Sequence, residues 1–292
     1  MFRQTSFDQR VVRYEEVHAI HPDDFRAFVD MTGVMDTHSK VLDCGCGYGA
    51  ITRELLRATE HSRTQGNTRL TIDLIDESAI QLSRARMELQ QWLSSRNATL
   101  SFIEGVFPDD LENGRTYDVI ACKMVLHEVD RGQQPSFVDG LYQSLTPQGR
   151  LLLWDICLSA DVADFFRAIV RRKDQLLGFD SMVQRRSFLT EEDLMNLFRR
   201  SSFERVQLAR DILYRFDTSR RFLTEFRADR EKFELWTDFV RERAANLPTS
   251  VRAYLHYSDC SAGISFDIRK VIAVAQRVEM ASRKSKLAGA TN

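Results

Sequence analysis

Short apolar runs alternate with amphipathic stretches through the first half of the chain. Helical periodicity begins at residues 50 and 78 and at about residue 135. Between these stretches, apolar strands are predicted at 41–42, 69–75, 99–103, 117–122 and 150–156. Strands that alternate with helices at this spacing are typical of βαβ units with right-handed crossovers. The pattern therefore predicts an α/β fold with a mostly parallel, doubly wound sheet.

Beyond residue 156 the chain is longer than a simple doubly wound sheet needs. Residues 158–187 and 217–256 have a helical pattern, and further strands are predicted at 203–213 and 270–277. In the second helical stretch the aromatic side chains follow helical spacing, which is typical of a core but also suits the roof of an apolar pocket. These side chains are Phe222, Phe226, Phe233 and Trp236.

Composition narrows the class of protein. The 292 residues include only 13 Gly and 5 Pro, which excludes collagen-like and low-complexity chains. The 41 basic and 42 acidic residues give a formal net charge of -1, so no global field draws the protein to nucleic acid or to an anionic membrane. Five cysteines, no apolar run long enough for a membrane span and no signal peptide predict a cytoplasmic protein with free thiols.

A glycine-rich turn follows the first predicted strand, in the segment Asp43-Cys44-Gly45-Cys46-Gly47-Tyr48-Gly49. Alternate glycines allow a sharp bend and a close approach of a ligand, and the next helix offers unpaired N–H groups. The third glycine comes one residue too early for the dinucleotide motif G-x-G-x-x-G, and no Gly-Lys-Ser/Thr follows as in a phosphate loop. The acid at the strand end favours a cationic or amine-bearing ligand.

The segment VLDCGCGYGAIT resembles the first motif of the class I S-adenosylmethionine-dependent methyltransferases. Three further matches follow in the order of that family, over about residues 40–156: LIDESAIQLSRAR, YDVIACKMVLHEV and LTPQGRLLLWD. The resemblance implies a Rossmann-like, doubly wound sheet of seven strands, with residues 270–277 as an antiparallel last strand. It also implies S-adenosylmethionine as cofactor.

The resemblance extends to individual residues. It implies that Asp43 lies near the methionine amino group, and that Asp76 accepts hydrogen bonds from both ribose hydroxyls through its two oxygens. The third motif lacks its usual acid, because Val106 and Phe107 follow Gly105. Phe107, backbone groups or Asp109 are the alternatives for contact with adenine. The predicted cofactor-binding residues are Asp43, Gly45, Cys46, Gly47, Gly49, Asp76, Glu77, Gln81, Val106, Phe107 and Lys123. No metal site is predicted, because Cys44 and Cys46 have no second pair at zinc spacing.

Candidates for catalysis lie at the ends of the fourth and fifth predicted strands. His127 is a candidate general base because an imidazole titrates near working pH, although helix packing and cofactor-side hydrogen bonding are competing interpretations. Asp155 is a second candidate for catalysis. The competing interpretation is that it caps a helix or a turn. Glu128 and His127 are predicted to face the substrate. Tyr14, in a segment that resembles the N-terminal helix that closes over the cofactor, is predicted to act as a lid or to pack in the core.

The predicted organisation follows from these assignments. It comprises an N-terminal helical cap (1–35), a cofactor-binding domain (36–216 and 264–280, with a helical insertion at 158–187), a helical substrate cap (217–263) and a flexible tail (281–292). The basic runs 171–173, 185–186 and 199–200 are interpreted as solvated helix faces rather than phosphate sites.

The predicted activity is methyl transfer from S-adenosylmethionine to an O, N or C nucleophile of a small molecule, with S-adenosylhomocysteine as product. The predicted partner is a small-molecule substrate, without nucleic acid or membrane insertion. Two alternatives stay open: a silent cofactor-binding homologue that acts as a sensor or partner subunit, and an RNA or protein methyltransferase. The sequence does not specify the substrate or the acceptor atom. The oligomeric state also stays open, and a homodimer is one of the alternatives.

Overall fold

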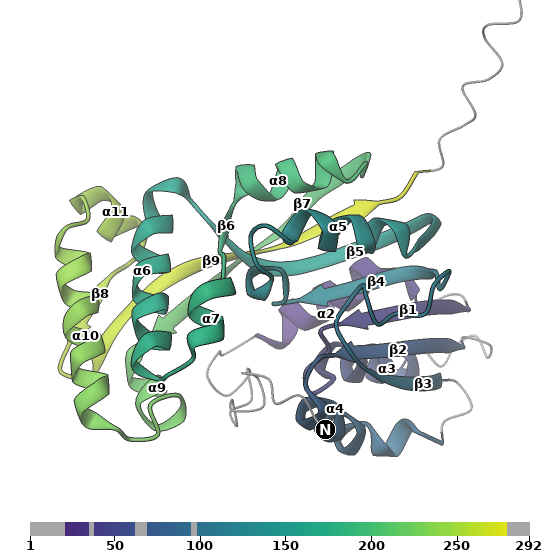
Figure 1. Cartoon of the computed structure of the whole chain (residues 1–292), viewed down its shortest axis with the longest axis horizontal. Helices are drawn as coiled ribbons and strands as arrows, with labels where there is room; N and C mark the ends of the chain where they lie inside the picture. Colours follow the sequence, from purple (N-terminus) through teal and green to yellow (C-terminus); the bar gives the residue numbers. More distant parts are fainter. Residues whose placement is uncertain (1–20, 35–37, 62–68, 95–97, 279–292) are drawn as a thin grey trace, which may run out of the picture.

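The computed structural model describes residues 21–34, 38–61, 69–94 and 98–278. Within these ranges one sheet has a main path of seven strands in the order β3-β2-β1-β4-β5-β9-β7. The strands are β1 (Ser39–Cys44), β2 (Leu70–Asp76), β3 (Ala98–Glu104), β4 (Tyr117–Lys123), β5 (Leu145–Leu158), β7 (Arg205–Asp217) and β9 (Gly263–Gln276). Strands β1 to β5 are parallel, and β9 lies antiparallel between β5 and β7 (Figure 1). The predicted α/β fold with an antiparallel last strand is therefore confirmed.

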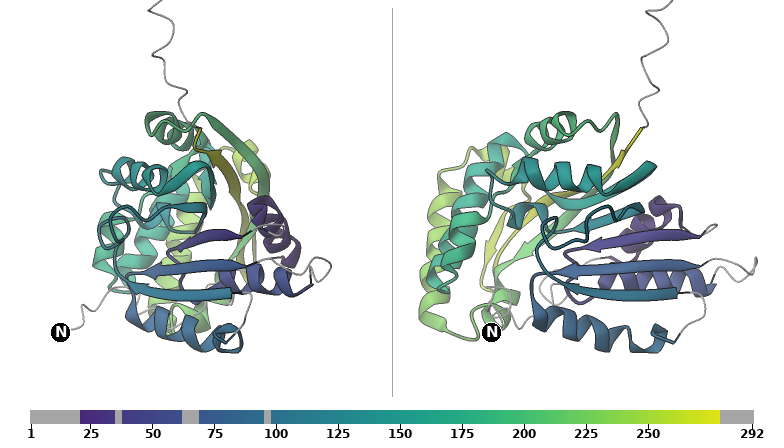
Figure 2. Two further views of the ribbon diagram at one scale, coloured as in Figure 1. Left: turned by 90° about the vertical axis from the view of Figure 1, so that its right-hand side faces the viewer. Right: turned by 45° about the vertical axis from the view of Figure 1, so that its right-hand side comes forward.

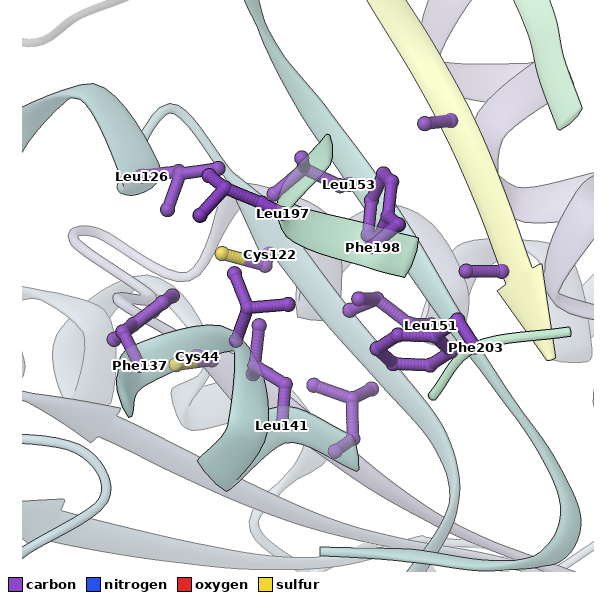
Figure 3. Close-up of a cluster of buried hydrophobic side chains, with 14 of the residues drawn as sticks. Cys44, Cys122, Leu126, Phe137, Leu141, Leu151, Leu153, Leu197, Phe198 and Phe203 are labelled. Atoms are coloured by element: carbon purple, nitrogen blue, oxygen red, sulfur yellow. The ribbon is translucent and has the colours of Figure 1, made fainter. Parts of the chain in front are cut away.

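Helices cover both faces of the parallel half of the sheet. Because side chains alternate between the two faces of a strand, Leu42 and Val41 of β1 enter two different cores. The core that contains Leu42 lies under α5 (Gln134–Gln143) and α8 (Glu191–Arg200), and Figure 3 shows part of it. The core that contains Val41 lies under α2 (Pro22–Thr32), α3 (Ala50–His61) and α4 (Ala79–Glu88). The near-continuous apolar strands follow from burial on both faces.

A second lobe surrounds the far ends of β7 and β9, which run on past the parallel strands (Figures 1 and 2). Its helices are α6 (Ala160–Leu176), α7 (Asp180–Arg185), α9 (Thr218–Thr224), α10 (Arg230–Ala245) and α11 (Thr249–Tyr254). Trp236 of α10 is fully buried, and its indole Nε1 donates to the carbonyl of Ile169 on α6 at 2.9 Å. Phe226 belongs to the same core, so the predicted aromatic stripe includes core residues of this lobe.

Several smaller features complete the described part of the chain. The short strands β6 (Leu189–Thr190) and β8 (Ser258–Cys260) pair with β5 and β9. The 3-10 turns are η2 (Gln90–Trp92) and η3 (Leu126–Glu128). Among the helices of the described residues, none combines the length and the apolar character that crossing a bilayer demands. The predicted division into domains and caps stays a prediction, and most of 1–35 and 281–292 lies outside the described residues.

Candidate functional site

A cavity of about 610 Å³ lies where the sheet meets the second lobe. Its sheet side is formed by the loops that follow β1, β2, β3 and β4, and its far side by residues of α6, α9 and the segment after α7. In open α/β sheets, ligands bind at the carboxyl ends of the strands. The cavity is therefore the candidate active site.

The loop after β1 depends on glycine for its path. Gly45 and Gly47 have positive φ angles of 66° and 54°, and both line the cavity together with Cys46. A Cβ atom on Gly45 would lie 2.3 Å from Cγ2 of Val125 in the loop after β4, so any larger residue would collide there. Gly49 also has a positive φ, but it packs against Leu89 and does not line the cavity.

Two carboxylates, that of Asp43 buried and that of Asp76 half-buried, hold this loop in place and face the cavity. Oδ2 of Asp43 accepts hydrogen bonds from Thr52, from the backbone N–H at 3.2 Å and from Oγ1 at 2.7 Å. Oδ2 of Asp76 accepts from the N–H of Gly47 at 2.8 Å, and its Oδ1 accepts from the N–H of Ser78 at 2.9 Å. Burial raises the pKa of Asp43 and of Asp76 to about 6, against the effect of these hydrogen bonds.

The other predicted cofactor-binding residues also line the cavity: Glu77, Gln81, Val106, Phe107 and Lys123. Glu77 accepts a hydrogen bond at 2.8 Å from Arg185 of α7, which joins the loop after β2 to the second lobe. Phe107 is buried and packs edge-on against Phe137, with ring centroids 5.4 Å apart. The side chain of Val106 is largely exposed, so it offers an apolar surface at the position of the missing acid.

His127 lies in η3 at the end of β4, enclosed by acids. Its Nδ1 is 2.6 Å from Oδ1 of Asp155, and its Nε2 is 3.3 Å from Oε1 of Glu128. Burial opposes a charge on the ring, but the two carboxylates outweigh it and raise the pKa of His127 to about 9. The imidazole is therefore protonated near neutral pH. His127 and Glu128 line the cavity, whereas Asp155 lies behind His127.

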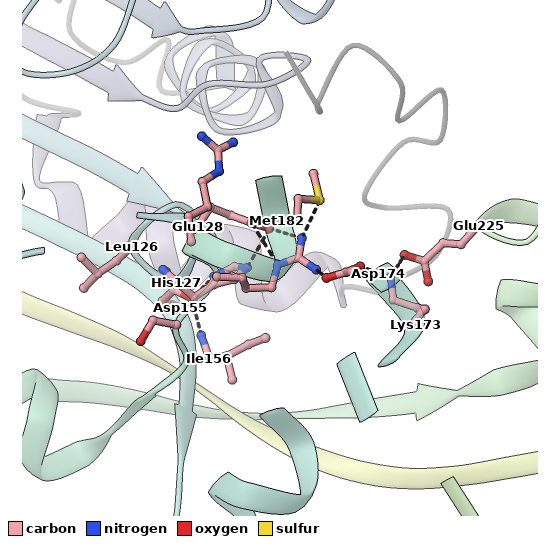
Figure 4. Close-up of polar contacts among 12 residues, drawn as sticks. Leu126, His127, Glu128, Asp155, Ile156, Lys173, Asp174, Met182 and Glu225 are labelled. Atoms are coloured by element: carbon pink, nitrogen blue, oxygen red, sulfur yellow. Dashed lines mark hydrogen bonds and ion pairs between the residues drawn. The ribbon is translucent and has the colours of Figure 1, made fainter. Parts of the chain in front are cut away.

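From this histidine a chain of buried charges crosses into the second lobe (Figure 4). Its members alternate in sign in the order Asp155, His127, Glu128, Arg186, Asp174, Lys173, Glu225 and Arg221. Arg186 donates to both oxygens of Glu128, at 2.5 Å and 3.0 Å, and to Oδ2 of Asp174 at 2.6 Å. Lys173 lies 2.5 Å from Glu225, which in turn is 3.1 Å from Arg221. The chain thus fixes α6, α9 and the segment after α7 against the end of β4.

Aromatic side chains form much of the far wall of the cavity. Phe166, Phe188 and Phe216 are each less than 5% exposed and line it together with Tyr214. Phe188 stacks on the ring of His127 with a centroid distance of 5.1 Å. The guanidinium of Arg221 lies 3.7 Å above the ring of Phe216 and donates to the Tyr214 hydroxyl at 2.7 Å.

Sequence reasoning missed this half of the site. Lys173 and Arg186 were interpreted as members of solvated basic faces, but both are buried in the charge chain. For Lys173 a signal was present, because it follows Phe166 by seven residues and Ile169 by four, on the apolar face of one helix. Tyr214 and Phe216 lie beyond the predicted strand at 203–213. The apolar alternation of Ile212, Tyr214 and Phe216 signals burial but not a cavity. Tyr14 lies outside the described residues.

Comparison with known proteins finds a family model that matches part of the chain. Residues 42–151 match the family model described as a methyltransferase domain. The fold is similar to that of the YcgJ protein of Bacillus subtilis, with a TM-score of 0.69 and 13% identity over 89% of this chain and 100% of that chain. For a protein of Bacillus halodurans named as a candidate methyltransferase, the TM-score is 0.68 and the identity 15%, over 88% of this chain and 100% of that chain.

A third similar structure contains a cofactor product. It is the 1,6-didemethyltoxoflavin-N1-methyltransferase of Burkholderia thailandensis, solved with 1,6-didemethyltoxoflavin and S-adenosylhomocysteine bound. Its TM-score is 0.50 and its identity 14%, over 94% of this chain and 84% of that chain. No curated protein matches the sequence.

Residues 42–151 thus match a methyltransferase domain, and the described sheet has the fold of the solved structures similar to it. The methyltransferase match and the S-adenosylhomocysteine bound in the Burkholderia thailandensis structure imply S-adenosylmethionine as cofactor. The site fits this group, because a nucleoside sulfonium needs a close backbone approach and acceptors for an amine and a diol. The positive-φ glycines and the two carboxylates at the cavity meet these needs.

Proposed function

We propose that the enzyme methylates an O, N or C nucleophile of a small molecule and releases S-adenosylhomocysteine. The observation that carries the proposal is the position of the second lobe, whose residues form the far wall of the cavity. A long polymer would need an open groove at this edge, whereas a walled cavity of this volume suits a small ligand. The Burkholderia thailandensis neighbour, which was solved with 1,6-didemethyltoxoflavin bound, supports this choice.

We further propose how the chain holds its cofactor. The backbone of Gly45, Cys46 and Gly47 lies beneath it, Asp43 pairs with its amino group, and Asp76 accepts from the ribose hydroxyls. Val106 and Phe107 offer apolar contact for the adenine, with Gln81 and Glu77 at the rim. The cofactor supplies an activated methyl group, so the protein has chiefly to orient the acceptor and exclude water.

His127 has a different role from the one suggested by its usual pKa. A ring held between Asp155 and Glu128 is already protonated, so it cannot accept a proton from the acceptor in this state. We propose that His127 and Asp155 position the loop after β4, next to the methyl group. A role of His127 as general base would require the loss of the proton that the two acids stabilise.

Transfer of label from methyl-labelled S-adenosylmethionine tests the proposal. The enzyme is incubated with a cell extract, which is then separated into small molecules, RNA and protein. Label is expected in the small-molecule fraction. Asp76→Ala should abolish it, whereas Asp164→Ala, at a side chain that is 94% exposed, should leave it unchanged. Label in RNA or protein would contradict the proposal, and cofactor binding without any label would favour the silent homologue.

A further inference from the structure

The far half of the cavity has flat, apolar walls. Phe166 meets Phe188 edge-on, with 4.9 Å between the ring centroids, and meets Phe216 at 5.8 Å. Ile156 and Val170 add aliphatic surface to the same wall. These rings are buried against one another, so their positions are set by packing before a ligand enters. Such walls favour a ligand that offers planar π surface, because aromatic contacts gain energy beyond simple burial.

The charges of the same half cancel one another. The chain from Asp155 to Arg221 holds four carboxylates and four cations, with His127 as imidazolium, and each cation lies within 3.4 Å of a carboxylate. Lys270 lies behind Tyr214, with its Nζ 3.8 Å from the ring centre, and does not line the cavity. Burial lowers the pKa of Lys270 and favours its uncharged amine.

The remaining charges on the cavity lining belong to other parts of it. Asp43, Asp76 and Lys123 lie at the carboxyl ends of β1, β2 and β4. Arg185 and Glu77 pair with each other at the cofactor side. Asp109, Asp130 and Arg227 are exposed at the rim, where water and salt screen them. A charged ligand in the far half would therefore exchange its hydration for a site whose buried charges already neutralise each other. That exchange is costly.

We propose that the acceptor substrate is an uncharged, planar heteroaromatic molecule with both hydrogen-bond donors and acceptors on its edge. This inference rests on the proposed function, since it places the acceptor in the same cavity. The rings of Phe166 and Phe188 contact its faces, whereas Phe216, which lies between the guanidinium of Arg221 and the stacked ring of Phe266, offers its edge. The alternating ammonium, guanidinium and carboxylate groups meet acceptors and donors on its edge, and Tyr214 adds a hydroxyl. Because the buried charges from Asp155 to Arg221 are neutral overall, the site selects its substrate by shape and hydrogen bonding instead of by charge.

Calorimetry on the protein saturated with S-adenosylhomocysteine tests the inference. Binding of that product is measured first, so that a failure of the cofactor site is recognised separately. Four probes of one skeleton follow: quinolin-2-one, its saturated counterpart decahydroquinolin-2-one, and quinolin-2-one carrying either a carboxylate or an aminomethyl group. Quinolin-2-one should bind at least about fivefold more tightly than the saturated ring and at least about tenfold more tightly than either charged form.

A matched pair of variants tests whether the affinity for quinolin-2-one depends on the aromatic wall. Phe188→Leu should weaken quinolin-2-one at least about threefold while S-adenosylhomocysteine binds as before. Phe239→Leu, at a phenylalanine of α10 that does not line the cavity, should change neither affinity. Tighter binding of a charged probe, equal binding of the saturated ring, or no binding of quinolin-2-one to a protein that binds the cofactor product would each overturn the inference.

Discussion

At the scale of single residues, the site is built on carboxylates that the fold keeps away from water. Asp43 is 2% exposed, yet its partners are the neutral backbone and hydroxyl groups of Thr52, with Lys123 as the nearby positive charge. A carboxyl group in such a place resists ionisation. The protein thus keeps a destabilising charge at this position, which is expected where the charge serves a ligand.

Asp43→Asn should therefore stabilise the cofactor-free protein. The amide oxygen can keep both hydrogen bonds from Thr52, while the charge disappears. The pKa of Asp43 is raised from 3.8 to about 6, which makes the ionised form unfavourable by up to about 3 kcal/mol at pH 7. This cost is fully present above pH 6 and vanishes below pH 3.8. Urea denaturation should therefore show Asp43→Asn to be more stable than the parent at pH 7 but not at pH 3.5.

The same variant should bind S-adenosylhomocysteine more weakly. Thr52→Val is the control, because it removes one hydrogen bond to Asp43 and should lower stability instead. A loss of stability at pH 7 in Asp43→Asn would show that the carboxylate contributes to folding and would contradict this account.

Cofactor affinity should depend on pH in a defined direction. If Asp43 and Asp76 bind the amine and the diol of the cofactor as proposed, they do so most strongly when ionised, and their pKa values are about 6. Affinity should stay constant from pH 7 to 8 and fall below pH 6, by up to about tenfold per pH unit for each carboxylate. Calorimetric titrations with S-adenosylhomocysteine would measure this. An affinity that does not change between pH 7 and pH 5 would remove both acids from the cofactor site.

At the scale of elements, the segment after α7 connects the two lobes. The N–H of Ser187 donates to the carbonyl of His127 at 2.8 Å, and Gln134 of α5 donates to the carbonyls of Leu126 and Ser187. Beside these bonds, Arg186 bridges Glu128 and Asp174. A short stretch without regular structure is thus held by backbone bonds and by one buried cation.

Arg186→Ala should lower the free energy of unfolding by about 3–5 kcal/mol. The loss is large because removing one partner of a buried ion pair leaves Glu128 and Asp174 uncompensated in the interior. Arg199→Ala, at an exposed position of α8, should change it by less than about 0.5 kcal/mol. Urea midpoints of the two variants and the parent provide the comparison, and similar midpoints for all three would contradict a structural role of the charge chain.

At the scale of the whole molecule, the cavity exists only because two lobes meet. The parallel strands end at one side of it, and β5, β7 and β9 continue past this edge to carry the second lobe (Figures 1 and 2). The long strands connect the lobes without a linker, so a ligand between them contacts parts of one continuous sheet and its helices.

Binding of S-adenosylhomocysteine should therefore slow amide hydrogen exchange on both sides of the cavity. We expect protection in the glycine loop, residues 44–49, and in the segment 179–188 of the second lobe, which contacts Glu77 through Arg185. Helix α11, which contributes no cavity-lining residue, serves as the internal reference. Protection of the glycine loop alone would show that the second lobe takes no part in cofactor binding.

The cofactor half of this site was predictable because its signals are local. Asp43 and the glycines occupy seven consecutive positions after a strand, and Asp76 ends the next strand, so a periodic pattern and a turn motif are enough to bring them to one sheet edge. The direction of β9 between β5 and β7 followed from the family resemblance. Gly49 belongs to the same motif, but it lies against Leu89 and does not line the cavity.

By itself, then, the sequence determined the alternating strands and helices and the turn after β1, since each depends on neighbours within a few residues. The cofactor was implied by the family resemblance of its motifs. Only the tertiary structure decided the partners of the second lobe. Lys173, Arg186 and Arg221 look like surface cations in the sequence, and their carboxylates come from other elements: Glu128 is 58 residues from Arg186, and Glu225 is 52 residues from Lys173. Whether a charge is solvated or buried depends on what the rest of the chain places around it.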